Sequence, residues 1–168
     1  MSISMYQASA PRFANTLRNL EGILRKGEAH AVACKYDPAV LLQARLYPDM
    51  FPLVRQVQIA CDNAKGPVAR LAGMEPPRHE DIETTFGELY SRIGRTLEFI
   101  ASVPAAAIDG AEERRITIKA GQSVFEFVGL QYLCGYAIPN FHFHVVTAYN
   151  ILRHNGVEIG KDDYLGSP

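Results

Sequence analysis

The fold of this chain is decided by residues 138–166, which read IPNFHFHVVTAYNILRHNGVEIGKDDYLG. At 100° per residue, four apolar side chains fall on one narrow face of a helix, with Ile151 at its edge: Phe141, Val145, Ala148 and Leu152. Pro139 suits the first turn of a helix, and Gly156 suits a left-handed cap at its end. These residues predict a buried helix that ends at His154.

The predicted helix separates its three histidines. His144 lies on the shoulder of the apolar stripe, on the same side as Asn140 one turn earlier. His142 points away from the centre of the stripe, because positions i and i+2 diverge on a helix. The two would converge on a metal only if the first turn were irregular. His154 falls on the far side, and we expect it to be solvated.

Length and composition indicate one domain that spans residues 1–168. The chain is 48% hydrophobic and 21% charged, with a net charge of −1, which offers no electrostatic footprint for nucleic acid or an anionic membrane. No apolar run approaches the roughly 18 residues of a membrane span. Three scattered cysteines (Cys34, Cys61 and Cys134) predict neither a disulfide framework nor a metal site. We therefore expect a cytoplasmic protein in which Cys61 is a small buried hydrophobe.

Three further helices are predicted from apolar spacing at threes and fours. The first runs from about Met5 to Lys26, with Pro11 marking a kink or a late start. The second runs from near Asp49, expected to be its N-cap, to Gly73, and the third from residues 79–81 to Pro104. Asp62 and Asn63 lie off the second helix's stripe and are interpreted as solvated. A short helix is expected within residues 38–46.

Residues 115–127 have a different character, because apolar and polar side chains alternate on both sides of a turn at 120–122. This pattern predicts a short β-hairpin, followed by one or two helical turns up to Ile138 that Gly135 and Pro139 break. The predicted fold class is therefore all-α: a four-helix bundle with long crossover connections and a possible short hairpin between its third and fourth helices.

Several motifs resemble a family of uncharacterised bacterial proteins in the superfamily of DinB/YfiT-like helical bundles. The resemblance covers nearly the whole chain, and the matching residues are Arg45-Leu46, Pro48–Phe51, Arg70–Gly73, Pro139–His144, Thr147–Tyr149, Ile151–Arg153, Asn155–Val157, Gly160-Lys161 and Asp163–Gly166. The resemblance implies a DinB-like four-helix bundle that is often dimeric, so we expect a homodimer. It implies no known activity.

The wider superfamily contains metalloenzymes that are similar in fold and bind a divalent ion through three histidines. One of these lies midway along the second helix, and two lie on the fourth helix in an H-x-x-x-H spacing. Aligned with this chain, the fourth-helix positions fall on Asn140 and His144, and the second helix offers Gln56 or Gln58. Because amides are weak ligands for zinc or nickel, the resemblance implies a degenerate site without a bound metal.

Two functions remain open at this stage. The first is binding of a small molecule or a protein partner, with His144, Asn140, Gln56, His142 and Tyr149 as candidate ligand-binding residues. The phenol of Tyr149 would face a pocket, although aromatic filling of the core explains it equally well. The alternative is a divalent-metal-dependent hydrolase or thiol-transferase-like enzyme that uses His144 and a metal-bound water. Residues 160–164 are interpreted as a surface tail, unless they order against the bundle or a partner subunit.

Overall fold

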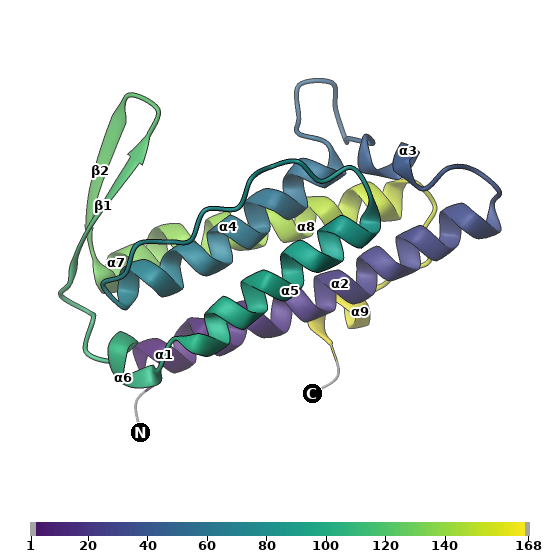
Figure 1. Ribbon diagram of the computed structural model, residues 1–168. Coiled ribbons are helices and arrows are strands. Elements are labelled where there is room, and N and C mark those ends of the chain that lie inside the picture. Colours follow the sequence, from purple (N-terminus) through teal and green to yellow (C-terminus); the bar gives the residue numbers. More distant parts are fainter. Residues whose placement is uncertain (1–2, 167–168) are drawn as a thin grey trace.

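The computed structural model describes residues 3–166, apart from the side chain of Ala120. In this part of the chain a bundle of four long helices confirms the predicted fold class, and the helices are α2 (Ala10–Ala33), α4 (Leu53–Leu71), α5 (Phe86–Ser102) and α8 (Ile138–His154) (Figure 1). Helices α2 and α8 run in one direction and α4 and α5 in the other. None of the described helices is long and apolar enough to cross a membrane.

Shorter elements lie around the bundle, most of them near its two ends (Figure 1). Six of them are short helical segments: α1 (Met5–Ala8), α3 (Ala39–Leu42), α6 (Ala105–Ile108), α7 (Gly129–Tyr132), the π-helical turn η1 (Leu133–Ala137) and α9 (Lys161–Leu165). The strands β1 (Arg115–Ala120) and β2 (Ser123–Val128) form the predicted hairpin, with Ile116 opposite Phe127. The hairpin projects away from one end of the bundle (Figure 1).

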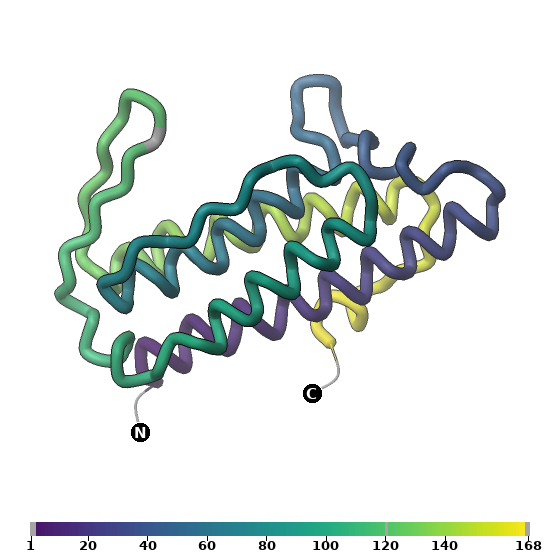
Figure 2. Tube along the Cα trace, in the orientation of Figure 1, coloured from purple at the N-terminus to yellow at the C-terminus, as the bar shows by residue number. Residues whose placement is uncertain are grey.

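Because α4 and α5 are parallel, the chain must return along the whole bundle between them. Residues 72–85, called the crossover below, make this return as an extended segment over α4 (Figure 2). The prediction that the third helix opens at residues 79–81 is therefore wrong. Helix α5 begins after Thr85, whose hydroxyl accepts a bond from the Glu88 amide at 3.2 Å while the Glu88 carboxylate accepts one from the Thr85 amide at 3.0 Å. This capping box sets the start of the helix.

The starts of the other helices also differ in part from the expectations. Pro11 marks a late start, because it lies in the first turn of α2 just after the break at Ser9, and α2 continues past Lys26 to Ala33. Asp49 is exposed and does not cap α4. A turn closed by the Met50 amide and the Tyr47 carbonyl at 3.0 Å holds this part of the chain, and α4 begins only after Pro52.

The prediction of a break at Gly135 and Pro139, before α8, is wrong. The chain stays helical from Gly129 through η1 into α8, because the wider π turn accommodates Pro139, which has no amide hydrogen for an ordinary i−4 bond. The predicted end is confirmed: Gly156 has a φ of 87° and follows the last turn as a left-handed cap.

The core lies between the four helices and contains the predicted apolar stripes. Phe13 of α2 meets Phe141 of α8 edge to face, with ring centroids 5.0 Å apart. Cys61 is fully buried as predicted, and burial raises the pKa of its thiol to about 12. This thiol is therefore a core side chain rather than a nucleophile.

The crossover is fastened to the bundle by a fully buried guanidinium, that of Arg92 on α5. Its nitrogens lie 3.1 Å from the buried carboxylate of Glu83, 2.9 Å from Asp81 and 3.0 Å from Asp62, and they donate to the Glu80 carbonyl at 3.0 Å. We call Arg92, Glu83, Asp81 and Asp62 the Arg92 cluster. Asp62 thus links α4 to α5, and although its side chain is 40% exposed, the interpretation of Asp62 as merely solvated missed this ion pair.

We expect Arg92→Met to lower the free energy of unfolding by about 3–5 kcal/mol, because it leaves the Glu83 carboxylate buried without its main cation. Urea denaturation followed by circular dichroism measures the loss. Arg95→Met is the matched control, since the Arg95 side chain is 56% exposed and lies 3.7 Å from Glu83, and it should cost no more than about 1 kcal/mol. Equal losses in the two variants would contradict the role assigned to Arg92.

Candidate functional site

The pairing of His144 with Gln56 joins α8 to α4 at the position that the superfamily comparison singles out. His144 Nδ1 lies 2.7 Å from Gln56 Oε1, while Gln56 Nε2 donates to the Phe51 carbonyl at 3.1 Å. This second bond fixes the amide orientation, so the Gln56 oxygen must accept and His144 Nδ1 must donate. The lone pair of the neutral imidazole is therefore on Nε2.

The surroundings of His144 favour this neutral form. Burial lowers its pKa, and the nearby guanidinium of Arg55 lowers it further. Nε2 of His144 has no hydrogen-bond partner among the described residues, and it is not fully buried. The exposed ring of Phe143 lies beside the site, with its centroid 5.3 Å from that of His144. Phe51, whose side chain is also exposed, supplies the carbonyl that orients Gln56. His144 thus offers a hydrogen-bond acceptor between a buried amide and an apolar surface.

The side chains at this position do not fit the three-histidine metal site of the superfamily. The amide oxygen of Gln56 is already occupied by His144, and Gln58 is buried and donates to Glu83 at 2.9 Å. Asn140, half-buried one turn before His144, supplies only a neutral amide. Within residues 3–166 no group of three His, Cys, Asp or Glu side chains is arranged to hold a metal ion. One imidazole nitrogen is too small a donor set for zinc or nickel.

His142 and Tyr149 lie apart from the His144–Gln56 pair and contact the end of the chain. His142 Nδ1 lies 2.8 Å from the Tyr164 hydroxyl, and the Tyr149 hydroxyl donates to the Ile159 carbonyl at 3.3 Å. His142 and Tyr149 are seven residues apart and therefore lie on one face of α8, which contacts residues 156–166. Residues 156–166 are called the C-terminal segment below.

The C-terminal segment is ordered against the bundle. Asn19 of α2 donates to the Tyr164 carbonyl at 3.0 Å, and Lys26 of α2 pairs with Asp163 at 2.6 Å. Its interpretation as a free surface tail is therefore wrong, and ordering against the bundle is correct.

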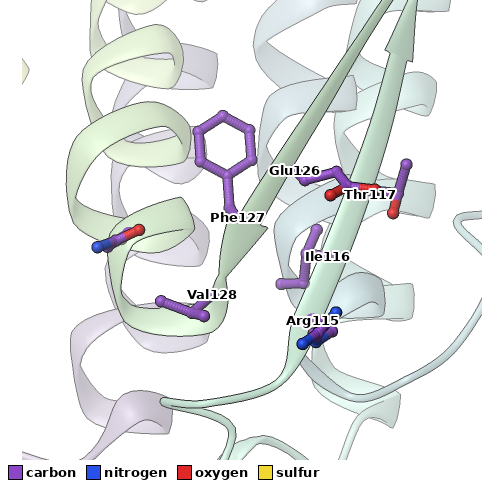
Figure 3. Close-up of a pocket in the computed structure, with 7 residues that line it drawn as sticks. Arg115, Ile116, Thr117, Glu126, Phe127 and Val128 are labelled. Carbon is purple, nitrogen blue, oxygen red and sulfur yellow. The ribbon is translucent and has the colours of Figure 1, made fainter.

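Two hollows lie beside the crossover and the hairpin, and neither is lined by His144. One, of about 280 Å³, lies between the strands and α7 and is lined by Arg115, Ile116, Thr117, Glu126, Phe127, Val128 and Gln131 (Figure 3). The other, of about 350 Å³, lies between α4 and the crossover. Periodicity along one helix does not reveal either hollow, because each depends on how distant segments meet.

Comparison with known proteins places the chain in a family. Residues 5–165 match the model of a domain of unknown function, DUF1993. The chain belongs to the DUF1993 family. The crystal structure of a DinB family member protein from Shewanella denitrificans is 45% identical, with a TM-score of 0.89 over 97% of this chain and 92% of that one. No protein of curated function matches the sequence. The predicted resemblance to DinB-like proteins is therefore confirmed.

We expect the stability of this DUF1993 protein to fall as the pH is lowered from about 7.5 to about 5.5. Burial lowers the pKa of His79, His142 and His144 in the folded state below their ordinary value of 6.5. The stability that these histidines contribute is complete above their pKa in the unfolded chain. It is lost as the pH falls through their lower pKa in the folded protein, because the unfolded chain then binds more protons. Urea denaturation across this range measures the loss.

His144→Gln removes one of the three titrating groups but keeps a polar side chain beside Gln56. It should lose less stability than the wild type over the same pH range. A loss of the same size in both proteins would show that His144 does not contribute to the pH dependence.

Proposed function

We propose that this DUF1993 protein binds a small molecule at His144 without the help of a metal ion. The single observation that supports this is the 2.7 Å contact between His144 Nδ1 and Gln56 Oε1. It uses the amide oxygen that a metal would need, and it presents the other imidazole nitrogen as an acceptor. At His144, the position that holds a metal ligand in the wider superfamily thus serves for hydrogen bonding.

The chemistry of the ligand follows from what surrounds Nε2. The acceptor nitrogen requires a donor, such as a hydroxyl or an amide N–H group. Phe143 is 59% and Phe51 54% exposed, so the neighbouring surface favours an apolar ring or chain. Asn140 adds an amide on the same side of α8. We therefore propose a ligand that combines an apolar body with one hydrogen-bond donor.

In this proposal His142 and Tyr149 have an indirect role, because they bind the C-terminal segment. Both contact that segment within 3.3 Å, which keeps the start and the middle of α8 covered on the side away from Gln56. The alternative of a metal-dependent hydrolase or thiol transferase is less well supported, because both glutamines of α4 already have protein partners.

Protein purified without an affinity tag should contain far less than one zinc or nickel per chain by elemental mass spectrometry. Phenol should shift the NMR signals of the His144 ring, and anisole, which has the same ring without the donor, should shift them much less. His144→Ala should remove the signal shifts that phenol causes in neighbouring backbone amides. His154→Ala, which changes an exposed histidine at the other end of α8, is the matched control.

Stoichiometric zinc or nickel that disappears in His144→Ala would overturn the proposal and favour the metal-dependent alternative. Equal responses to phenol and anisole would show that Nε2 is not the recognition element.

We also propose that the protein is a homodimer that uses its hairpin. A two-stranded sheet is only marginally stable alone, and β1 and β2 pair with no further strand among the described residues. Val124 and Phe125 on β2 are 58% and 42% exposed, so a second copy would cover apolar side chains there.

Phe125→Lys should convert the dimer to a monomer, because it places a charge within the proposed interface. Light scattering after size-exclusion chromatography measures the mass. Val40→Lys, at a residue of α3 that is 62% exposed, should leave the mass unchanged. A monomeric wild type would contradict the proposal.

A further inference from the structure

The hollow between α4 and the crossover, called the crossover cavity below, is rich in nitrogen-bearing side chains. Its volume is about 350 Å³, and its lining residues are Asp62, Lys65, Gly66, Arg70, Glu75, Pro76, Pro77, Arg78 and His79. Three are cations, and two are carboxylates. The whole chain has a net charge of −1, so the positive excess here is a local feature.

The two carboxylates do not neutralise the cavity equally. Asp62 already pairs with Lys65 and, at 3.0 Å, with Arg92, so its charge is shared between two cations. Neither Arg70 nor Arg78 is within ion-pair distance of a carboxylate among the described residues. Glu75 is therefore the one carboxylate of the lining without an ion pair in the described part of the chain.

The site is built into the backbone of α4. Lys65 has a side chain that is only 4% exposed, so its charge is held inside the cavity wall. A Cβ at Gly66 would lie 2.6 Å from Nη1 of Arg70, so the missing side chain allows that guanidinium to lie back along the helix. There Nη1 donates to the Tyr132 hydroxyl at 3.3 Å, and the other nitrogens of Arg70 have no ion pair among the described residues. Gly66 and Pro67 both disfavour a helix interior, yet α4 contains them next to this cavity.

An unused polar atom completes the lining. Nδ1 of His79 is buried and has no hydrogen-bond partner within the described residues. Burial lowers the pKa of His79, and Lys65, Arg95 and Arg92 lower it further against the opposing effect of Asp62. The field at His79 is thus positive, as a bound anion would require.

We propose that the crossover cavity binds a small molecule through a carboxylate or phosphate group, held by Arg70 and Arg78 above Lys65. Planar guanidinium groups donate in pairs to such oxyanions. Pro76 and Pro77 restrict the backbone of the opposite wall, and the Arg92 cluster fixes the crossover in place. The site is separate from His144, and it does not depend on the function proposed above.

Isothermal titration calorimetry with inorganic phosphate and with citrate tests the proposal, with sodium chloride at matched ionic strength as the blank. We expect saturable binding of at least one anion. Binding of phosphate alone indicates a phosphate ester as the natural ligand, and binding of citrate alone indicates a carboxylate.

Arg70→Gln and Arg78→Gln should each weaken that binding about tenfold, because each removes charged hydrogen bonds. Glu75→Gln should tighten it by about two- to fivefold, because it removes a repulsive carboxylate. Arg153→Gln, at an exposed arginine without an ion pair in the described residues, and His144→Ala should both bind as the wild type does.

The proposal is overturned if neither anion binds beyond the sodium chloride blank. It is also overturned if the wild type and both cavity arginine variants bind equally. Unchanged melting temperatures in Arg78→Gln, whose side chain is exposed, would ensure that weaker binding does not reflect unfolding.

Discussion

The burial of one guanidinium, that of Arg92, is the constraint on which the rest of this structure depends. A fully buried cation is costly unless carboxylates and carbonyls surround it, and here they come from α4 and from the crossover. The crossover is extended and has few bonds of its own, so Glu83 and Asp81 hold it against the bundle. Because α4 and α5 run in parallel, this long return is unavoidable, and Arg92 sets where it lies.

Helix α4 consequently serves two sides of the molecule. Gln56 faces α8 and orients His144, whereas Asp62, Lys65 and Arg70 lie on the side of the crossover. Polar side chains are tolerated on both sides because nearly every one has a partner. The apolar stripe between them, which includes Val57 and Cys61, keeps these two polar regions apart. A ligand on one side therefore need not disturb the other.

Much of the architecture follows from the sequence, and the failures have physical causes. Helix α8 was predictable because its stripe, Pro139 and Gly156 agree, and the hairpin because apolar and polar residues alternate. Glu80 and Asp81 imitate the acidic first turn of a helix, but the Asp81 carboxylate and the Glu80 carbonyl bind Arg92. The Thr85–Glu88 capping box was the better signal. Periodicity describes one helix at a time, so it could not show that Asp62 and the crossover share Arg92. Arg92 lies beside Ile93 on the buried face of α5. A charged residue at such a position was the overlooked sign that another segment, the crossover, packs against this helix.

The candidate site shows the same division between local and long-range information. The resemblance placed His144 at a site to which the second helix offers Gln56 or Gln58, and the structure pairs it with Gln56. It could not predict the carbonyl of Phe51, which orients the amide and thereby decides which nitrogen of His144 stays free. That carbonyl lies in a segment without regular structure, where position depends on packing rather than on a residue period. An amide in place of an imidazole thus does more than weaken a metal site. Once its nitrogen is held by the backbone, its oxygen orients the remaining histidine with Nε2 as the acceptor.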